Sequence, residues 1–199
     1  MLIVTGTGRS GTSFVAKWLY HCGKIDYEPN WIDNYNAGFE PQSVSRVNGA
    51  IFIGNDKELS LPEHILEFIE KIDLKLVKDP LFFYPNVINY WAKVKKDIKI
   101  LVCLRNFEDV YKSRVYKGMN NAHPPEKLRE FHTMFKATVS KLNIPTETII
   151  FPEFLEQFDE VYEKIIRLEP AIELDYDLSK DIFERLADKS LVNFGYEKG

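Results

Sequence analysis

Four short apolar runs, each followed by a segment with helical spacing, constrain the fold of this chain most. The runs lack the polar alternation of a strand with one face in water, so each predicts a strand buried on both faces. Such strands, alternating with helices, form a parallel sheet covered by helices on both sides. The predicted strands are 2–5, 74–77, 98–104 and 148–151. We therefore predict an α/β fold with three layers and a mostly parallel sheet flanked by helices.

Apolar spacing and proline positions predict the helices between and after these strands. The predicted helices are 11–22, 41–53, 60–72, 85–96, 106–116, 124–142, 152–168 and 178–191. Residues 24–39, rich in aromatic and polar side chains, predict an irregular loop. A length of 199 residues suits one domain, and no internal repeat divides it. We predict a single domain over residues 1–199.

Charge and composition exclude several classes of protein. The formal net charge of −4 argues against a nucleic-acid-binding protein. Two cysteines are too few for a disulfide framework, and the four histidines have no metal-ligand spacing with them, so no metal site is predicted. No apolar run approaches the length of a membrane span, and no basic and apolar leader precedes the first strand. We expect a cytoplasmic protein without a membrane anchor; the sequence carries no signal for its oligomeric state.

The glycine-rich stretch after the first predicted strand predicts an anion-binding loop. It follows a strand and opens a helix, which is the context that a phosphate loop requires. Glycines let successive N–H groups turn inward, and the helix N-terminus adds partial positive charge. The predicted ligands are Gly8, Arg9, Ser10, Gly11, Thr12 and Ser13. The alternative is a turn that serves only the strand–helix connection.

One position separates this loop from the ATP type. The spacing from Gly6 to Gly11 matches that type, but Thr12 stands where its phosphate-binding lysine belongs. Arg9, inside the loop, supplies a cation instead. The missing lysine argues against nucleoside triphosphate chemistry.

A second candidate anion site follows the third predicted strand. Arg105 lies at the carboxyl edge of the sheet, where a guanidinium can bind a phosphate through two hydrogen bonds. Ser113, about two helical turns later, can donate a hydroxyl. Taken alone, this spacing is weak, and the alternative is an Arg105 that pairs with Glu108 or Asp109.

Together, the two candidate sites resemble motifs of the sulfotransferase superfamily, which uses 3′-phosphoadenosine-5′-phosphosulfate (PAPS). Residues 8–13 are similar to the 5′-phosphosulfate loop of that family, and residues 104–114 are similar to its 3′-phosphate motif. Segments 38–41, 77–80 and 194–197 are also similar to bacterial members. The resemblance implies a P-loop-like sulfotransferase fold in which PAPS is the sulfuryl donor and no metal is needed.

The resemblance also implies roles for individual residues. Arg9 and the backbone of residues 10–13 would bind the 5′-phosphosulfate, and Arg105 and Ser113 would bind the 3′-phosphate. The chain departs from the cytosolic branch of the family at two points. That branch has a histidine after a lysine near the second strand, where this chain has Lys78 and Asp79, and it has a late Arg-Lys-Gly loop that is not evident here.

Sulfuryl transfer to a hydroxyl needs a base, and the predicted catalytic residues are Glu40, Lys78 and Asp79. The first choice is Glu40, which follows the first helix, where bacterial and tyrosylprotein-type members place a catalytic glutamate. The alternative is a solvated acid before a helix. Asp79 is the second choice, or else a turn residue before Pro80. Lys78 would neutralise the transferring group, or else pair with Asp79.

Two competing functions remain at this stage. One is a phosphate-loop kinase with Asp79 as its Mg²⁺ ligand, and the other is a nucleotide-binding protein without catalysis. The acceptor is expected to be a small molecule, a glycan or a lipid, bound by residues 24–39 and 117–125.

Overall fold

A four-stranded parallel sheet forms the centre of the protein. The computed structural model describes residues 1–23, 67, 69–72, 74–119 and 122–187. The strands are β1 (Leu2–Gly6), β2 (Leu76–Lys78), β3 (Lys99–Arg105) and β4 (Thr146–Phe151). Their order in the sheet is β2-β1-β3-β4, and all neighbours are parallel. Helices flank this sheet, which confirms the predicted fold class.

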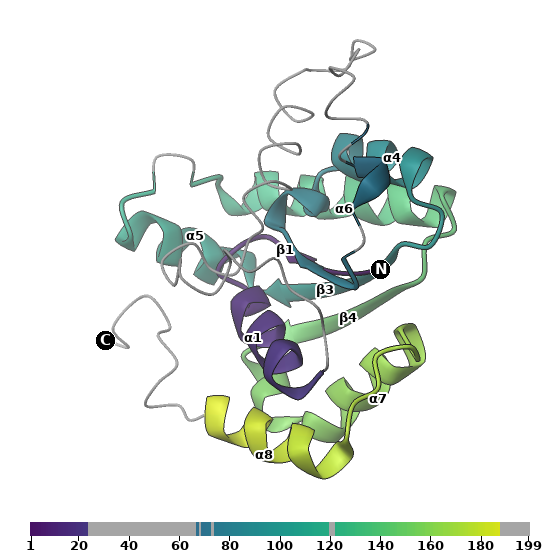
Figure 1. Ribbon diagram of the computed structural model, residues 1–199. Helices are drawn as coiled ribbons and strands as arrows, with labels where there is room; N and C mark the ends of the chain where they lie inside the picture. Colours follow the sequence, from purple (N-terminus) through teal and green to yellow (C-terminus); the bar gives the residue numbers. More distant parts are fainter. Residues whose placement is uncertain (24–66, 68, 73, 120–121, 188–199) are drawn as a thin grey trace.

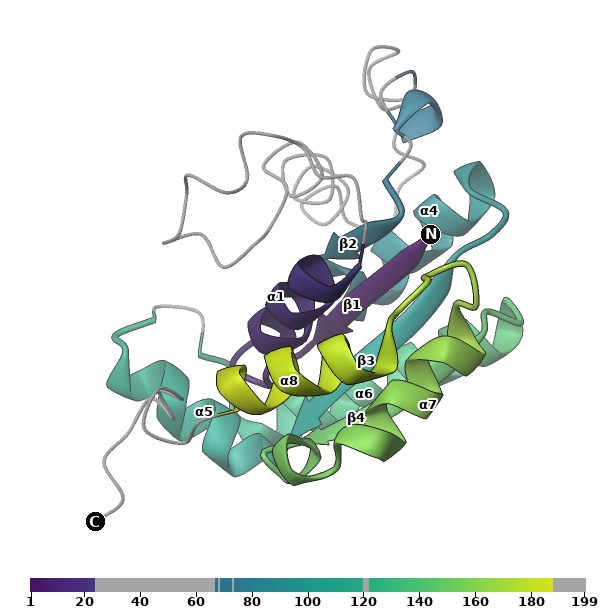
Figure 2. The ribbon, with the colours of Figure 1, turned by 60° about the horizontal axis from the view of Figure 1, so that its bottom comes forward.

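Helices cover both faces of the sheet (Figure 1). On one side lie α1 (Thr12–Cys22), α7 (Phe158–Leu168) and α8 (Tyr176–Leu186), which Figure 2 shows side by side. On the other side lie α4 (Pro85–Val94) and α6 (Pro125–Lys141). A further helix, α5 (Phe107–Tyr116), lies at the carboxyl end of the sheet in both views.

Alternate residues of β1, β2 and β3 enter two separate cores. The prediction of a strand buried on both faces is wrong for β4, where Ile149 and Phe151 enter one core and Ile150 is 45% exposed. In β1, Leu2 and Val4 pack into the core under α1, α7 and α8, whereas Ile3 packs into the core under α4 and α6. In β3, Leu101 and Ile100 divide in the same way. Because both faces are buried, no position of these strands needs a polar residue, and this explains the continuous apolar runs.

Trp18 fixes α1 against α8. Its indole Nε1 donates a hydrogen bond to the carbonyl of Ser179 at 2.9 Å. Its ring packs edge-on against Phe183 and Phe158, with centroid distances of 5.0 and 5.9 Å. A buried tryptophan whose N–H has a partner combines a large apolar contact with a satisfied polar group. The second half of α1 is thereby held against α8.

Some predicted boundaries are wrong. The second strand begins two residues later than expected and includes Lys78, which therefore lies within the strand. The helix predicted over 152–168 is divided into a 3-10 helix, η4 (Glu153–Glu156), and α7. Gln157, between them, has non-helical backbone angles (φ −126°, ψ 48°). The break lets Phe154 pack on Phe151 at 5.8 Å between centroids while Phe158 packs on Trp18. Tertiary packing thus overrides the local helical pattern.

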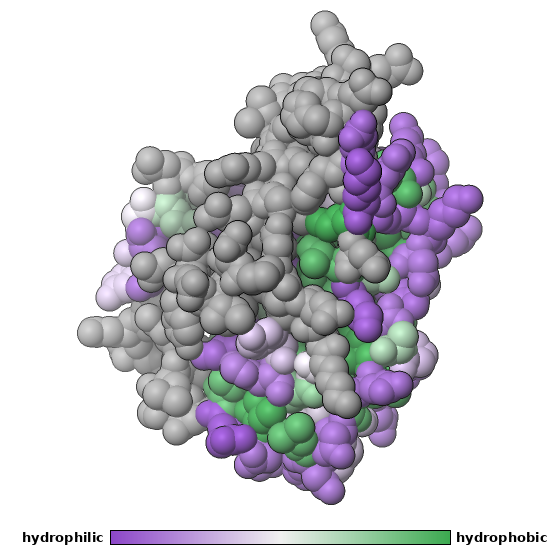
Figure 3. Space-filling view, viewed as in Figure 1, coloured by the Kyte–Doolittle hydropathy of each residue, from purple (hydrophilic) through white to green (hydrophobic). Residues whose placement is uncertain are grey.

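Other predictions fall outside the described residues. They are the irregular loop 24–39, the helix 41–53, most of the helix 60–72, and the last part of the helix 178–191. Within the described ranges, no helix combines the length and apolar character that crossing a membrane requires. Figure 3 shows hydrophilic side chains that stand out around α4 on the described part of that face.

The strand order positions the site. The chain passes from β1 to β2 on one side of β1, and then back to β3 on the other side. In open parallel sheets, ligands bind beyond the carboxyl ends of the strands at such a reversal. The two segments that follow β1 and β3 meet there, and they are the two segments predicted to bind anions.

Candidate active site

The loop between β1 and α1 contains positive φ angles, which glycine adopts easily and most other residues do not. Gly8, Arg9 and Gly11 all have positive φ angles, of 69°, 60° and 87°. Arg9 is not a glycine, so this left-handed conformation is unfavourable by about 1–2 kcal/mol. Strained residues of this kind are held in place by their surroundings and concentrate at functional sites. The conformation of Arg9 therefore supports a binding role for the loop.

Gly11 is required at the start of α1 for two reasons. It is the N-cap residue of the helix and has a left-handed backbone. In addition, a Cβ at this position would lie 2.8 Å from Phe151 Cδ2 and 2.9 Å from Phe154 Cζ. The absence of a side chain lets the helix start pack closely against the end of β4.

The loop also has polar groups that lack protein partners. Ser10 is fully buried, and its Oγ has no hydrogen-bond partner among the residues that the structure describes. No side chain within the same residues caps the N-terminus of α1, whereas Asn106 caps α5 through the N–H of Glu108. Buried polar groups are nearly always satisfied, and the N–H groups of a helix N-terminus attract anions. A phosphate bound in this loop would satisfy both.

The structure brings the two predicted anion sites into direct contact. Arg9 Nε donates a hydrogen bond to Ser113 Oγ at 3.1 Å. Arg105 Nη1 donates to the carbonyl of Arg9, also at 3.1 Å, and its guanidinium lies 5.2 Å from the ring centre of Phe151. Both Arg105 (6% exposed) and Ser113 (0% exposed) are buried. The predicted ligands from β1 and β3 thus form one continuous surface.

Sequence reasoning missed one residue of this surface, Arg114. Its Nη2 donates a hydrogen bond to the carbonyl of Thr7, and only 8% of the residue is exposed. In sequence, Arg114 resembles an ordinary basic residue in the last turn of a helix, where a positive charge interacts favourably with the helix dipole. The available signals were its position next to Ser113 and its place at the end of segment 104–114, which resembles the 3′-phosphate motif.

The positive charges of this surface act on one another. Burial, and then the nearby charge of Arg105, lower the pKa of Arg9. The pKa of Arg114 is also lowered, first by burial and further by Arg9, although Tyr84 opposes the shift. Arginine stays charged despite such shifts. Closely spaced cations in a partly dry site favour the binding of a highly charged anion.

Glu108, one of the two acids considered as a partner of Arg105, has a partner of its own. It forms an ion pair with Arg129 on the surface. A backbone hydrogen bond and Arg129 lower the pKa of the Glu108 carboxyl group. The hydrogen bond that Arg105 donates to Arg9 carries the guanidinium toward the loop.

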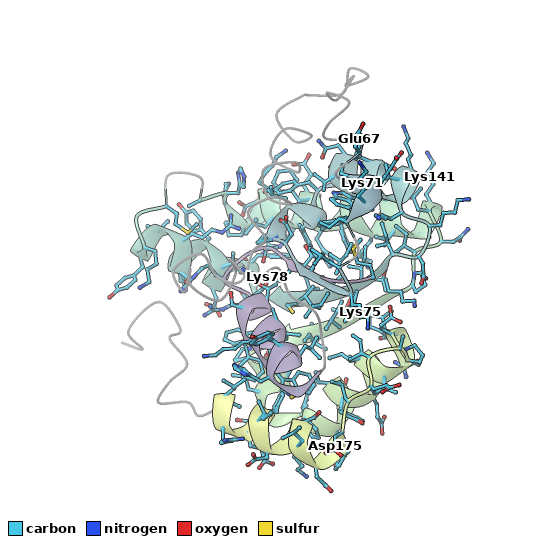
Figure 4. The ribbon with its side chains drawn as sticks, in the orientation of Figure 1. Glu67, Lys71, Lys75, Lys78, Lys141 and Asp175 are labelled. Carbon is cyan, nitrogen blue, oxygen red and sulfur yellow. The ribbon has the colours of Figure 1, made fainter. Side chains whose placement is uncertain are left out.

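Lys78 ends β2 and Asp79 follows it, next to β1, the strand that precedes the loop. Lys78, 3% exposed, lies at the carboxyl end of β2, whereas Lys75 lies just before the first residue of that strand (Figure 4). Asp79 is fully buried, its N–H donates to the carbonyl of Val4 at 3.0 Å, and its Oδ1 accepts from the N–H of Leu81 at 2.7 Å. Asp79 therefore caps the 3-10 helix η3 (Pro80–Phe83). The third predicted catalytic residue, Glu40, lies outside the described residues.

Comparison with known proteins bears on the fold. No family model matches the sequence, and no curated protein matches it. Among solved structures, the sulfotransferase domain from the olefin synthase of Synechococcus PCC 7002 matches with a TM-score of 0.53 and 12% identity, over 89% of this chain and 75% of that one. The sulfotransferase domain from the curacin biosynthetic pathway matches with a TM-score of 0.53 and 10% identity, over 89% of this chain and 76% of that one.

The chain has a sulfotransferase-like fold. In this sulfotransferase-like fold, Arg9 follows β1, Arg105 is the last residue of β3 and Ser113 lies in the helix after β3, at the reversal of strand order. The similarity of fold does not assign roles to side chains, because one fold hosts many functions. The roles of the predicted site residues therefore rest on the geometry described above.

Proposed function

We propose that this chain is a sulfotransferase that moves the sulfuryl group of PAPS to a hydroxyl or amine of a small-molecule, glycan or lipid acceptor. The observation that carries the proposal is the hydrogen bond from Arg9 to Ser113. This hydrogen bond joins the proposed phosphate loop to a second group of anion-binding residues. Both groups are within reach of one small ligand. Adenosine 3′,5′-bisphosphate, the nucleotide part of PAPS, carries two phosphates on one ribose and suits such a paired site.

The described residues fit the phosphates of this donor. The buried Oγ of Ser10 and the N-terminus of α1 offer donors to a 5′-phosphate, and Arg9 adds a charge. Arg105 and Ser113 offer a guanidinium and a hydroxyl to a 3′-phosphate. Adenosine triphosphate has no 3′-phosphate, so this second group of ligands favours PAPS.

The transfer forms a bond from sulfur to the acceptor oxygen or nitrogen and breaks the bond from sulfur to the 5′-phosphate oxygen. The products are the sulfated acceptor and adenosine 3′,5′-bisphosphate, and the acceptor proton passes to a carboxylate base. As in phosphoryl transfer, we expect positioning and stabilisation of the leaving phosphate to supply most of the rate enhancement. Arg9 and the loop N–H groups would stabilise that charge, and Lys78 would neutralise the transferring group.

Glu40 is the base that we propose. Asp79 is the second candidate, but its Oδ1 already accepts the hydrogen bond that caps η3, and its side chain is fully buried. A carboxylate that serves as a cap is a poorer proton acceptor, because the hydrogen bond stabilises its charged form.

A ligand-stabilisation experiment tests the proposal. Adenosine 3′,5′-bisphosphate at 100 times its Kd should add about 2.7 kcal/mol to the free energy of unfolding. ADP with Mg²⁺, at the same concentration, is the control and should add much less. Stabilisation by ADP with Mg²⁺ alone would overturn the proposal in favour of a phosphate-loop kinase. No stabilisation by either ligand would also count against it.

A further inference from the structure

We propose that Arg114 is a positioning residue that holds the loop between β1 and α1 in its anion-binding form. The inference rests on the proposed function, because it assigns a role at the same nucleotide site. It concerns the shape of the loop rather than contact with the reacting atoms.

The first support is the contact between Arg114 and the loop backbone. Its Nη2 donates to the carbonyl of Thr7, the residue before the left-handed pair Gly8 and Arg9. The C=O and the N–H of one peptide group point in opposite directions. A Thr7 carbonyl that is held outward by this bond therefore lets the N–H of the same peptide group turn inward. Successive N–H groups turned toward one point form an anion-binding concavity.

The fit between Arg114 and the loop is close. A Cβ added to Gly8 would lie 3.1 Å from Arg114 Nη2, and Gly8 has a φ of 69°. A side chain at position 8 would therefore crowd the guanidinium and would also have to adopt a left-handed backbone. Gly8 and Arg114 form a matched pair, although 106 positions separate them in the sequence.

The second support is the position of Arg114 next to Ser113 in α5. Ser113 accepts a hydrogen bond from the Arg9 side chain, and Arg114 donates one to the Thr7 carbonyl. Two consecutive residues of one helix thus contact the loop at two points. The loop and the second anion site are consequently joined by a rigid element rather than by side chains alone.

The third support is an unused donor. Arg114 is more than nine-tenths buried, and its Nε has no hydrogen-bond partner among the residues that the structure describes. Burial of a charged group with an unsatisfied donor is costly, so stability alone does not account for this residue. An anion held by the loop, beside Arg9, would offset that cost.

The type of side chain matters to this role. A guanidinium is planar and presents several donors in a fixed arrangement, whereas an ammonium is a flexible point charge. Arg114→Lys therefore keeps the charge while it loses the geometry. The variant separates a positioning role from a contribution of charge alone.

The test measures the affinities of adenosine 5′-monophosphate and adenosine 3′,5′-bisphosphate by calorimetry. The variants are Arg114→Ala and Arg114→Lys, and the control is Arg185→Ala, an exposed arginine that also lies in the last turn of a helix. We expect Arg114→Ala to weaken both ligands by the same factor, about 10–100-fold, since hydrogen bonds to charged groups are worth about 1.5–3 kcal/mol. Arg114→Lys should recover only part of that loss, and Arg185→Ala should lose nothing.

Hydrogen exchange of the ligand-free protein distinguishes a local change in the loop from a general loss of stability. In Arg114→Lys, exchange should quicken in the peptide that covers residues 6–13 and stay unchanged in β3. Unchanged affinity for the monophosphate, or quickened exchange spread evenly over the sheet, would overturn the inference.

The two proposals fail in different ways. Wild-type protein that binds the bisphosphate no better than the monophosphate overturns the sulfotransferase function. The role of Arg114 is then still decided by the monophosphate affinities and by the exchange of the loop peptide.

Discussion

Arg9 and Ser113 are 104 residues apart in the sequence, yet Arg9 Nε donates a hydrogen bond to Ser113 Oγ at 3.1 Å. Arg9 was predicted to bind a 5′-phosphate and Ser113 a 3′-phosphate, so the two expected ligand groups touch. In the proposed function, a nucleotide with both phosphates would exchange this contact for contacts of its own. The two ends of the proposed nucleotide site are coupled through the Arg9 side chain.

Arg105→Ala is expected to weaken adenosine 3′,5′-bisphosphate and to spare adenosine 5′-monophosphate. Loss of a guanidinium that binds a phosphate should cost about 1.5–3 kcal/mol of binding free energy. Calorimetric titration of both ligands measures the difference. Arg167→Ala is the control, because Arg167 is an exposed arginine that pairs with Glu147 on the surface. Equal losses for the two ligands would refute the 3′-phosphate assignment.

Glu40→Gln is expected to keep nucleotide binding and to abolish transfer, because the amide cannot accept the acceptor proton. The measurement is release of adenosine 3′,5′-bisphosphate from PAPS with a panel of alcohol, phenol and sugar acceptors.

Asp79→Asn is the matched control for that experiment. Asparagine still offers an oxygen to the N–H of Leu81, so η3 keeps its cap while the carboxylate is lost. Asp79→Asn should retain transfer. Retained transfer in Glu40→Gln, together with its loss in Asp79→Asn, would make Asp79 the base.

Gly11→Ala is expected to reduce the free energy of unfolding by roughly 2–5 kcal/mol. About 1–2 kcal/mol comes from a left-handed residue with a Cβ, and about 1–3 kcal/mol from the contact of that Cβ with Phe151 and Phe154. Urea denaturation measures the change.

Gly118→Ala separates these two causes. Gly118 also has a positive φ, of 64°, but a Cβ there would meet no heavy atom within 4 Å. Its substitution should therefore cost only the backbone part, about 1–2 kcal/mol. An equal cost at both glycines would show that Phe151 and Phe154 yield without strain.

The sequence was sufficient to predict the sheet and the loop because their signals are local. Continuous apolar runs indicate strands buried on both faces, and Ile3 and Ile100 lie in the core as such runs require. The positive φ angles at Gly8 and Gly11 fall on the glycines that marked the loop.

Features that depend on distant partners could not be predicted. The role of Arg114 depends on the Thr7 carbonyl, which no local pattern brings near. The break at Gln157 reflects the packing of Phe154 and Phe158 on other elements. The hydrogen bond that Asp79 accepts from the N–H of Leu81 is local by contrast, and it agrees with the alternative prediction of a turn residue before Pro80.

We expect His132 to make the stability of the protein depend on pH in the weakly acidic range. Its ring is stacked on Phe83 at 6.0 Å and packs edge-on to Phe107 at 5.9 Å. Burial, and then the charge of Lys136, lower the pKa of His132 below the usual 6.5. The unfolded chain therefore binds a proton at a pH where the folded protein does not.

This difference in proton binding fixes the sign of the effect. The contribution of His132 to stability is present above pH 6.5 and is lost as the pH falls below that value toward the lowered pKa of the folded state. Urea denaturation at pH 7.5 and pH 5 should show a larger loss of stability in the wild type than in His132→Gln, which cannot titrate. An NMR titration of the imidazole gives the pKa of His132 directly. A pKa above 6.5, or an equal loss of stability in both proteins, would contradict the prediction.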